Sequence, residues 1–283
     1  MISPNFSHVT LATAFSPRFL AGLAEAWRFS RRFDAKFSII SNGEPTEEKE
    51  TMLSQGLEHL GIPADTPMEW RSGDPVDAII EGTGAIGTDL LVAGALIREF
   101  EVSGRLFLGG VAKGLLKRGS CSILLITKPA VEPRQYKRIV MVTDFSEGAR
   151  NAFHAALRIA EQDEAEHLHV VAIRSQLTEA RKDMEPGGKD RPSGEAMLEE
   201  FANIASDSIV NVDPRVIESA TGVAAADFIK SVEANLLVIP TTHDPDGTLL
   251  PPQMDWVTQA IPCDLWVVKK EKTPPYSEEI QHA

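Results

Sequence analysis

Short runs of β-branched and other apolar residues alternate along the chain with longer segments in which apolar residues recur every three or four positions. We interpret the short runs as strands, because they end at glycine, proline or polar turn residues. The longer segments predict helices, among them residues 46–60 and 76–81. Strands that alternate with helices in this way are typical of a parallel sheet covered by helices on both faces.

The pattern occurs twice. VTLATAFSPRFLAGLAEAWRFS begins at Val9, and IVMVTDFSEGARNAFHAALRIA begins at Ile139, an offset of 130 residues. Each copy also carries second to fifth strands, from KFSIIS to CSILLITK in the first and from LHVVAI to CDLWVVKK in the second. The recurring residues are Thr13, Phe15 and Ser16, which match Thr143, Phe145 and Ser146.

We therefore expect an α/β fold of two tandem doubly wound domains, flavodoxin-like or Rossmann-like. Each would contain one five-stranded parallel sheet, with the flavodoxin-like order the natural one, and a pseudo-two-fold would relate two separate sheets in a pseudo-dimer. The expected boundaries are 1–130 and 137–270, followed by a tail at 271–283.

Several shorter segments add local expectations. Ser16 before Pro17 and Ser146 before Glu147 are good helix starts. Residues 130–136 are a short linker, and the Gly/Pro-rich stretch 178–197 is an expected mobile loop. We interpret the acidic stretches 161–166 and 197–201 as solvated helix faces. The aromatic residues at helical spacing are expected in the core: Trp27, Phe29 and Phe33.

Charge and composition exclude several classes of protein. The net charge is −13, divided as −2 over residues 1–130 and −11 over 131–283, which argues against a broad nucleic-acid surface. No apolar run is long enough to span a membrane, and MISPNFSHVT lacks a secretory pattern. The two cysteines, Cys121 and Cys263, form no CxxC pair, so neither a disulfide framework nor a zinc site is expected. A cytoplasmic location is the simplest expectation.

RIVMVTDFSEGARNAFHAALRIA resembles the opening of a universal stress protein domain, and TDLLVAG followed by LFLGGVAKGLLKRGSCSILLITK resembles its end. Family members that bind ATP have a glycine after the fourth strand, a second glycine three residues later, and then Gly-Ser. The resemblance implies that such glycines surround the ribose and phosphates, and that an Asp after the first strand reaches the adenine side. It also implies that the fifth strands pair across a two-fold axis, here within one chain.

The first copy keeps part of that pattern. Gly94 closes the fourth strand, and Gly109 stands twelve residues before Cys121, but the middle glycine is missing and the Asp is replaced by Ala14. The glycine pair could cradle a phosphate or only form a tight turn. By resemblance, with Lys113 added from its place one turn later, the expected nucleotide-binding residues are Ala12, Thr13, Ala14, Ile40, Gly94, Gly109, Gly110, Val111 and Lys113.

The second copy has the opposite defects. It keeps Asp144, which with Thr143 forms an expected residual site or else only caps the turn. Its fourth strand closes with Pro240, and Pro251 and Pro252 stand where the first copy has its glycine pair. Two prolines remove two N–H donors, so we expect at most one ATP per chain. Trp256 could fill the vacated position or bind another apolar ligand.

No catalytic motif is apparent, so enzymatic activity is not expected, and neither is a metal site. His167 and His169 are interpreted as polar positions on a strand near an edge. The leading hypothesis is that the protein is a stress-response factor that binds an adenine nucleotide. The alternatives are a scaffold without a nucleotide, a small-molecule binder or a slow ATPase. A homodimer and an unidentified protein partner are further expectations.

Overall fold

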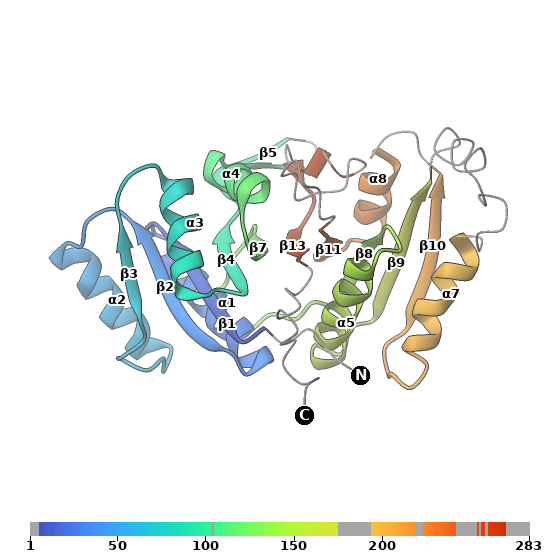
Figure 1. Cartoon of the computed structure of the whole chain (residues 1–283), viewed down its shortest axis with the longest axis horizontal. Coiled ribbons are helices and arrows are strands. Elements are labelled where there is room, and N and C mark those ends of the chain that lie inside the picture. Colours follow the sequence, from blue (N-terminus) through green and yellow to red (C-terminus); the bar gives the residue numbers. More distant parts are fainter. Residues whose placement is uncertain are drawn as a thin grey trace, which may run out of the picture.

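The computed structural model describes residues 6–102, 105–174, 194–218, 223–241, 254, 256, 257 and 260–269. These form two α/β units, one at each end of the molecule in Figure 1. The elements of the first unit are β1 (His8–Thr13), α1 (Phe19–Phe33), β2 (Lys36–Asn42), α2 (Glu47–His59), β3 (Met68–Arg71), α3 (Pro75–Ile86), β4 (Leu90–Gly94), β5 (Leu96–Val102), β6 (Arg105–Leu108), α4 (Gly110–Arg118) and β7 (Ser122–Ile126).

The second unit repeats this plan. Its elements are β8 (Arg138–Thr143), α5 (Glu147–Gln162), β9 (His167–Arg174), α7 (Gly194–Ile204), β10 (Val212–Glu218), α8 (Val223–Ser231), β11 (Leu236–Pro240), β12 (Ala260–Ile261) and β13 (Asp264–Val268). The ten strands predicted from the sequence are therefore present. Of the expected mobile loop, 178–193 lies outside the described residues and 194–197 begin α7; the tail 271–283 also lies outside them.

Within each unit the five main strands are parallel and follow the order 3-2-1-4-5. The predicted doubly wound fold is confirmed. The strand order is that of the first five strands of a Rossmann sheet rather than the flavodoxin order 2-1-3-4-5. The expectation of two separate sheets is wrong. The fifth strands β7 and β13 pair antiparallel and join the units into one sheet of ten strands, as the resemblance implied. This pairing leaves neither fifth strand as an exposed edge.

Most helices begin where the sequence predicts. Asp74 caps α3 ahead of Pro75, Thr46 caps α2, and the Ser146 side chain accepts a hydrogen bond from the Ala149 N–H at α5. The Ser16 start is wrong. Helix α1 begins at Phe19, and the Ser16 hydroxyl only accepts a hydrogen bond from the Arg18 N–H within the preceding turn.

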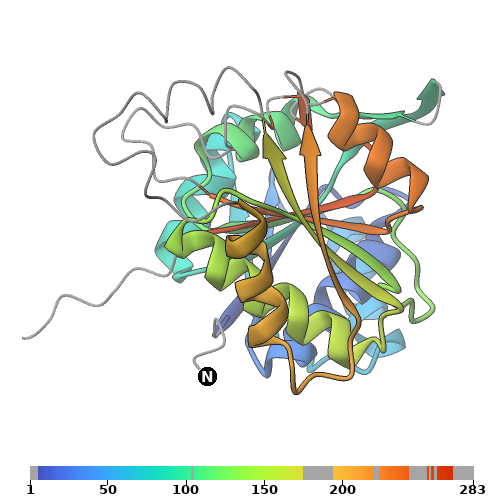
Figure 2. The ribbon, with the colours of Figure 1, turned by 90° about the vertical axis from the view of Figure 1, so that its right-hand side faces the viewer.

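Two buried apolar layers cover the faces of the sheet. Helices α1, α2, α5 and α7 pack on one layer, and α3, α4 and α8 pack on the other; Figure 2 shows α5 and α7 opposite α8. The prediction for the α1 aromatics is confirmed for Phe29 and Phe33, which are buried, whereas Trp27 is half-buried against the same layer. Trp266 of β13 is fully buried in this layer, so the second unit contributes to the core beside α1.

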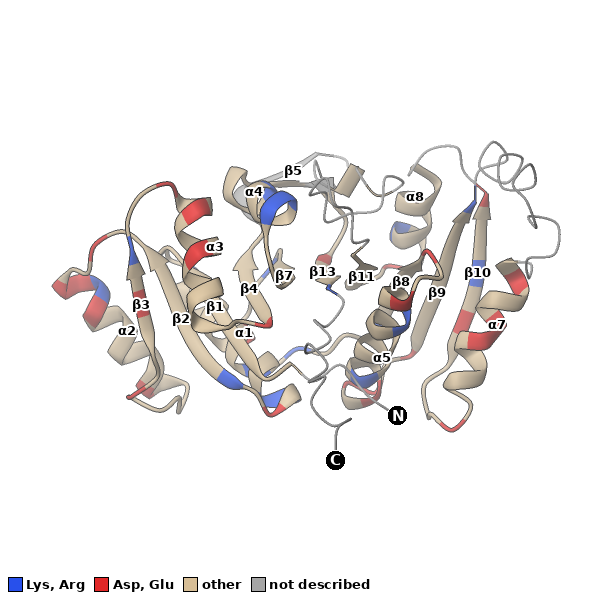
Figure 3. Ribbon diagram, viewed as in Figure 1, with Lys and Arg blue, Asp and Glu red and all other residues tan. Residues whose placement is uncertain are grey.

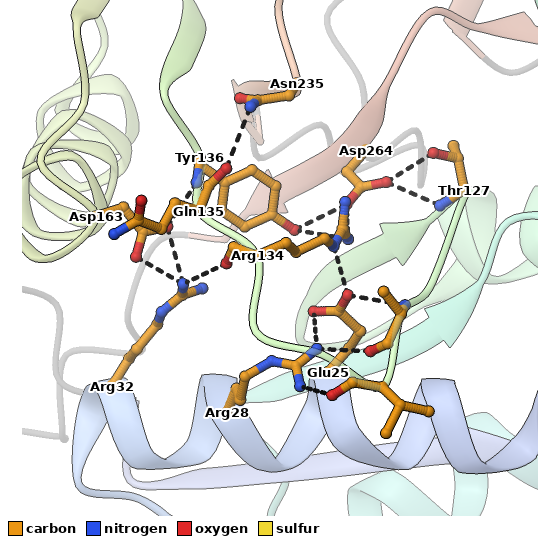
Figure 4. Close-up of polar contacts among 12 residues, drawn as sticks. Glu25, Arg28, Arg32, Thr127, Arg134, Gln135, Tyr136, Asp163, Asn235 and Asp264 are labelled. Atoms are coloured by element: carbon orange, nitrogen blue, oxygen red, sulfur yellow. Dashed lines mark hydrogen bonds and ion pairs between the residues drawn. The ribbon is translucent and has the colours of Figure 1, made fainter.

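The linker is held by buried charged residues from both units (Figure 4). Arg134 is central, because its guanidinium donates to Glu25 of α1 and to Asp264 of β13. Both carboxylates are almost fully buried, at 2% and 1% exposure. Asp264 also accepts hydrogen bonds from the Tyr136 hydroxyl at 2.8 Å and from the Thr127 N–H and hydroxyl at 2.8 and 2.7 Å. The linker is therefore fixed at the junction of the two units.

A second carboxylate fixes the other end of the linker. Arg32 of α1 donates to both oxygens of Asp163 at 2.6 and 2.8 Å, and the Tyr136 N–H donates to the same carboxylate at 2.7 Å. The interpretation of residues 161–166 as a solvated face is thus wrong for Asp163, which is 4% exposed. For residues 197–201 the prediction of a solvated face is confirmed only in part, because the two glutamates are exposed but Leu198 and Phe201 are buried.

The sequence did not predict the small sheet at the carboxyl edge. Residues after Gly94 form the hairpin β5–β6, whose other edge pairs antiparallel with β12 of the second unit. This three-stranded sheet lies across the top of both units, where Figure 1 labels β5.

Candidate functional site

The carboxyl ends of β1, β2 and β4 meet at one edge of the first unit. Ala12 on β1 lies beside Ile40 on β2 and beside Ala93 on β4, one residue before Gly94. Strands β1 and β4 are the switch point of the sheet, where open α/β sheets bind their ligands. The register therefore brings predicted residues from three strands to one place.

The glycine turn before α4 lies at the same edge. Gly109 is the N-cap of α4, and its N–H donates to the Ala95 carbonyl at 2.9 Å, next to Gly94. No side chain caps this helix start. The Gly109 N–H is therefore engaged within the protein, and in the predicted set the amides of Gly110 and Val111 are the first-turn donors with no partner inside the helix.

Two of these glycines face open space. A Cβ built on Gly94 or on Gly110 would meet no heavy atom within 4 Å, and neither residue has a positive φ. Both residues are exposed. Neither packing nor backbone conformation therefore demands glycine there. By contrast, a Cβ on Gly114 of the same helix would lie 2.5 Å from a methyl of Val76, so Gly114 serves the contact of α4 with α3.

The turn after the first strand has the same form in both units. Phe15 and Phe145 have φ values of 49° and 62°, and their N–H groups donate to the hydroxyls of Thr13 and Thr143 at 3.4 and 3.0 Å. Asp144 is exposed, and its carboxylate accepts a hydrogen bond from the Ser146 N–H at 2.9 Å. Of the two readings of Asp144, this geometry favours the turn cap. Ala14, at the equivalent place in the first unit, is also exposed.

The carboxyl edge of the second unit's sheet differs from that of the first unit at the end of the fourth strand. Pro240 ends β11 and is buried, and the Thr241 N–H donates to the Val268 carbonyl as Ala95 does to Ile126. Between this point and β13, the described residues form no α-helix. Pro251 and Pro252 lie outside the described residues. Trp256 is half-buried and packs on the apolar layer, and its indole N–H has no partner among the described groups.

The charged side chains of the helix that follows the glycine turn are all positive. Helix α4 carries Lys113, Lys117 and Arg118 and no acidic residue, so its ribbon in Figure 3 shows blue but no red. Arg118, in the last turn, is paired with Asp77 of α3. Lys113 is half-buried one turn beyond Gly109. An anion near the start of α4 is therefore favoured by Lys113 as well as by the helix dipole.

The remaining candidate groups have structural partners. His169 of β9 bonds to Asp213 at 2.9 Å and His167 to Asn211 at 3.0 Å, both next to the edge strand β10. No group of three or more metal-ligating side chains occurs in the part of the chain that the structure describes. Burial raises the pKa of Cys121 to about 11 and that of Cys263 well above its usual value, so both thiols are protonated and unreactive at neutral pH.

Comparison with known proteins follows this geometry. Residues 135–269 match the Universal stress protein family. This half of the chain is a universal stress protein domain. No curated protein matches the chain, and no helix among the described residues is long and apolar enough to cross a membrane.

Solved structures extend the same fold over the first unit. A universal stress protein from Archaeoglobus fulgidus DSM 4304 is 17% identical, with a TM-score of 0.67, and the match covers 93% of this chain and 98% of that one. A functionally unknown protein from Pseudomonas aeruginosa PAO1 is 18% identical, with a TM-score of 0.67 and coverage of 93% and 92%. A putative universal stress protein from Pseudomonas aeruginosa UCBPP-PA14 is 17% identical, with a TM-score of 0.64 and coverage of 94% and 93%. At these identities the similarity establishes the fold of the whole chain.

Proposed function

We propose that the chain is a tandem universal stress protein, with domains at 1–130 and 137–270, whose first domain binds one adenine nucleotide at the carboxyl edge of its sheet. The observation that carries this proposal is the pair Gly94 and Gly110. Each is exposed, has an ordinary φ and has open space around its missing Cβ. A close ligand accounts for glycine at both places, because a phosphate on a backbone amide leaves no room for a side chain.

The start of α4 supplies the chemistry that a phosphate requires. Its first-turn amides point out of the helix start, and the dipole places partial positive charge there. Lys113, one turn beyond Gly109, adds to this field. Adenine is the proposed base because of the family resemblance. Of the predicted apolar residues at this edge, Ala12 of β1 is half-buried and could contact the base, whereas Ile40 of β2 is fully buried and only supports the site from beneath.

The second domain is proposed to bind no nucleotide. Its fourth strand ends in Pro240, Pro251 and Pro252 stand in the sequence where the first copy has its glycine pair and remove two N–H donors, and the Asp144 carboxylate is engaged in its own turn. We further propose that the protein acts without catalysis and in a reducing compartment. Its two cysteines are buried and unpaired, which agrees with that location.

The test is isothermal titration with ATP on the intact chain and on Gly110→Ala. The wild type is expected to show one site per chain. The added methyl of Gly110→Ala should lower the affinity at least about tenfold, equivalent to 1.4 kcal/mol, while leaving the fold intact, because alanine is favoured over glycine in a helix. Gly84→Ala is the matched control, since Gly84 is also an exposed helical glycine with open space at its Cβ.

Two outcomes would contradict the proposal. If the wild type gives no binding heat and acid extracts of the purified protein contain no nucleotide, the chain is a scaffold without nucleotide. If Asp144→Asn abolishes ATP binding and Gly110→Ala does not change it, the site lies in the second domain.

A further inference from the structure

The turn that starts α4 is connected to the second domain through β6. Strand β6 ends at Leu108, one residue before the N-cap Gly109. On its outer edge Phe107 pairs with Ala260 and Leu106 with Ile261, both in β12 of the second domain. A backbone pairing between the domains thus lies within two residues of the proposed phosphate turn.

Buried side chains reinforce this connection. Ile261 is 1% exposed and belongs to the same apolar cluster as Leu108 and the inner face of α4. The members of this cluster that lie near the connection are, from the first domain, Leu108, Ala112 and Leu115, and from the second, Met254, Val257 and Ile261. Each of them is at most 3% exposed. Close-packed interiors of this kind transmit a displacement of one element to its neighbour.

We propose that the second domain is a positioning element for the ligand site of the first, with β12 holding β6 and the turn at Gly109–Gly110 in the geometry that binds phosphate. The ligand part of this proposal rests on the proposed function; the mechanical coupling does not. When β12 is paired, the turn is ordered before the ligand arrives. When the pairing is lost, ligand binding must also order the turn. The apparent affinity is then the intrinsic affinity multiplied by the fraction of chains in which the turn is already formed.

This arrangement makes the site sensitive to the contact between the domains. An event that separates β12 from β6 weakens nucleotide binding without touching a ligand-binding residue, and the nucleotide in turn strengthens the β12–β6 pairing by the same factor. The second domain, proposed to bind no nucleotide, would then regulate the domain that does.

The experiment compares Ile261→Ala with Leu198→Ala in the intact chain. Both remove a buried aliphatic side chain from the second domain, but Leu198 lies on α7 in the other apolar layer, away from β6. Ile261→Val is the conservative variant, which keeps most of the contact if the alanine variant does not fold. ATP affinity is measured by titration calorimetry, and hydrogen–deuterium exchange is measured at the amides of residues 106–112.

Ile261→Ala is expected to weaken ATP binding at least tenfold and to accelerate exchange at residues 106–112, whereas Leu198→Ala leaves both close to wild type. Ile261→Val should change both in the same direction by a smaller amount, and if Ile261→Ala does not fold, an Ile261→Val variant identical to Leu198→Ala would overturn the proposal. An ATP affinity within twofold of wild type in a folded Ile261→Ala would overturn the proposal, as would equal acceleration of exchange in Leu198→Ala. If the wild type binds no ATP, the proposed function fails, and exchange alone decides the coupling: acceleration in Ile261→Ala supports it, and unchanged exchange overturns it.

Discussion

Replacing Arg134 with Met tests how strongly the buried charges hold the two domains together. Met keeps an unbranched side chain but removes the guanidinium that bonds to Glu25 and Asp264. Removing one partner of a buried ion pair typically costs about 3–5 kcal/mol, because a carboxylate is left buried without its countercharge. Here the lower end applies, about 3 kcal/mol, because the Arg134 side chain is 26% exposed and both carboxylates keep other donors.

The assay is differential scanning calorimetry at neutral pH. For chains of this size, 1 kcal/mol corresponds to a change of roughly 2–4 °C in Tm, so Arg134→Met should melt about 6–12 °C below wild type. The matched control is Arg138→Met. Arg138 forms ion pairs with Glu166 and Glu233, whose side chains are 57% and 78% exposed, and such surface pairs contribute about 0–1 kcal/mol.

A double variant separates charge from packing. If the cost arises from an uncompensated carboxylate, adding Glu25→Gln to Arg134→Met should recover part of the lost stability, because the neutral amide is less costly to bury. Equal Tm values for Arg134→Met and Arg138→Met would refute the reasoning, and so would a double variant that is less stable than Arg134→Met alone.

Two further predictions concern packing and pH. Gly114→Ala should lower the free energy of unfolding in urea by about 1–3 kcal/mol, because its Cβ would lie 2.5 and 2.9 Å from the two methyls of Val76, a stiff β-branched side chain. Adding Val76→Ala should restore most of this stability. If the second substitution restores none of it, the clash is not the cause. Burial, and then the charge of Asp264, raise the pKa of Tyr136 well above 10, so the folded state holds that proton more tightly than the unfolded chain and stability is lost as pH rises above 10. Tyr136→Phe should therefore be less stable than wild type at pH 8 but lose less stability between pH 10 and 11, whereas a constant difference in unfolding free energy would argue against this titration.

The sequence predicts the fold well because the signals for it are local. The sequence segments of β2 and β9, and those of β4 and β11, are rich in apolar and β-branched residues in both copies. Such continuous apolar segments are typical of parallel strands, which are buried on both faces of the sheet. The repeat then fixes the number of strands per domain, and the register of β1 with β2 and β4 brings Ala12, Ile40 and Gly94 to one edge. The strands themselves are predicted from residues close together in the chain, and the repeat supports them by showing the same pattern twice.

The contacts that the sequence does not reveal are long-range. Asp163 stands in a run of charged residues, and only the tertiary fold shows that it is buried against Arg32 and Tyr136. The strand β6 is hard to predict because its partner β12 is only two residues long and lies more than 150 residues away. At the site, the glycines were visible, but the bond from the Gly109 N–H to Ala95 moves the available donors to Gly110 and Val111.

The second domain remains structurally necessary even where it has lost the nucleotide pattern. Trp266 is fully buried against Phe6, Phe29 and Phe33, all of which belong to the first domain. A chain cut in the linker would expose this aromatic cluster and the whole edge of β7, which β13 now covers, and a long apolar strand edge is a template for aggregation. The fold of the first domain therefore depends on β13 and on the buried Asp264, whatever the second domain binds.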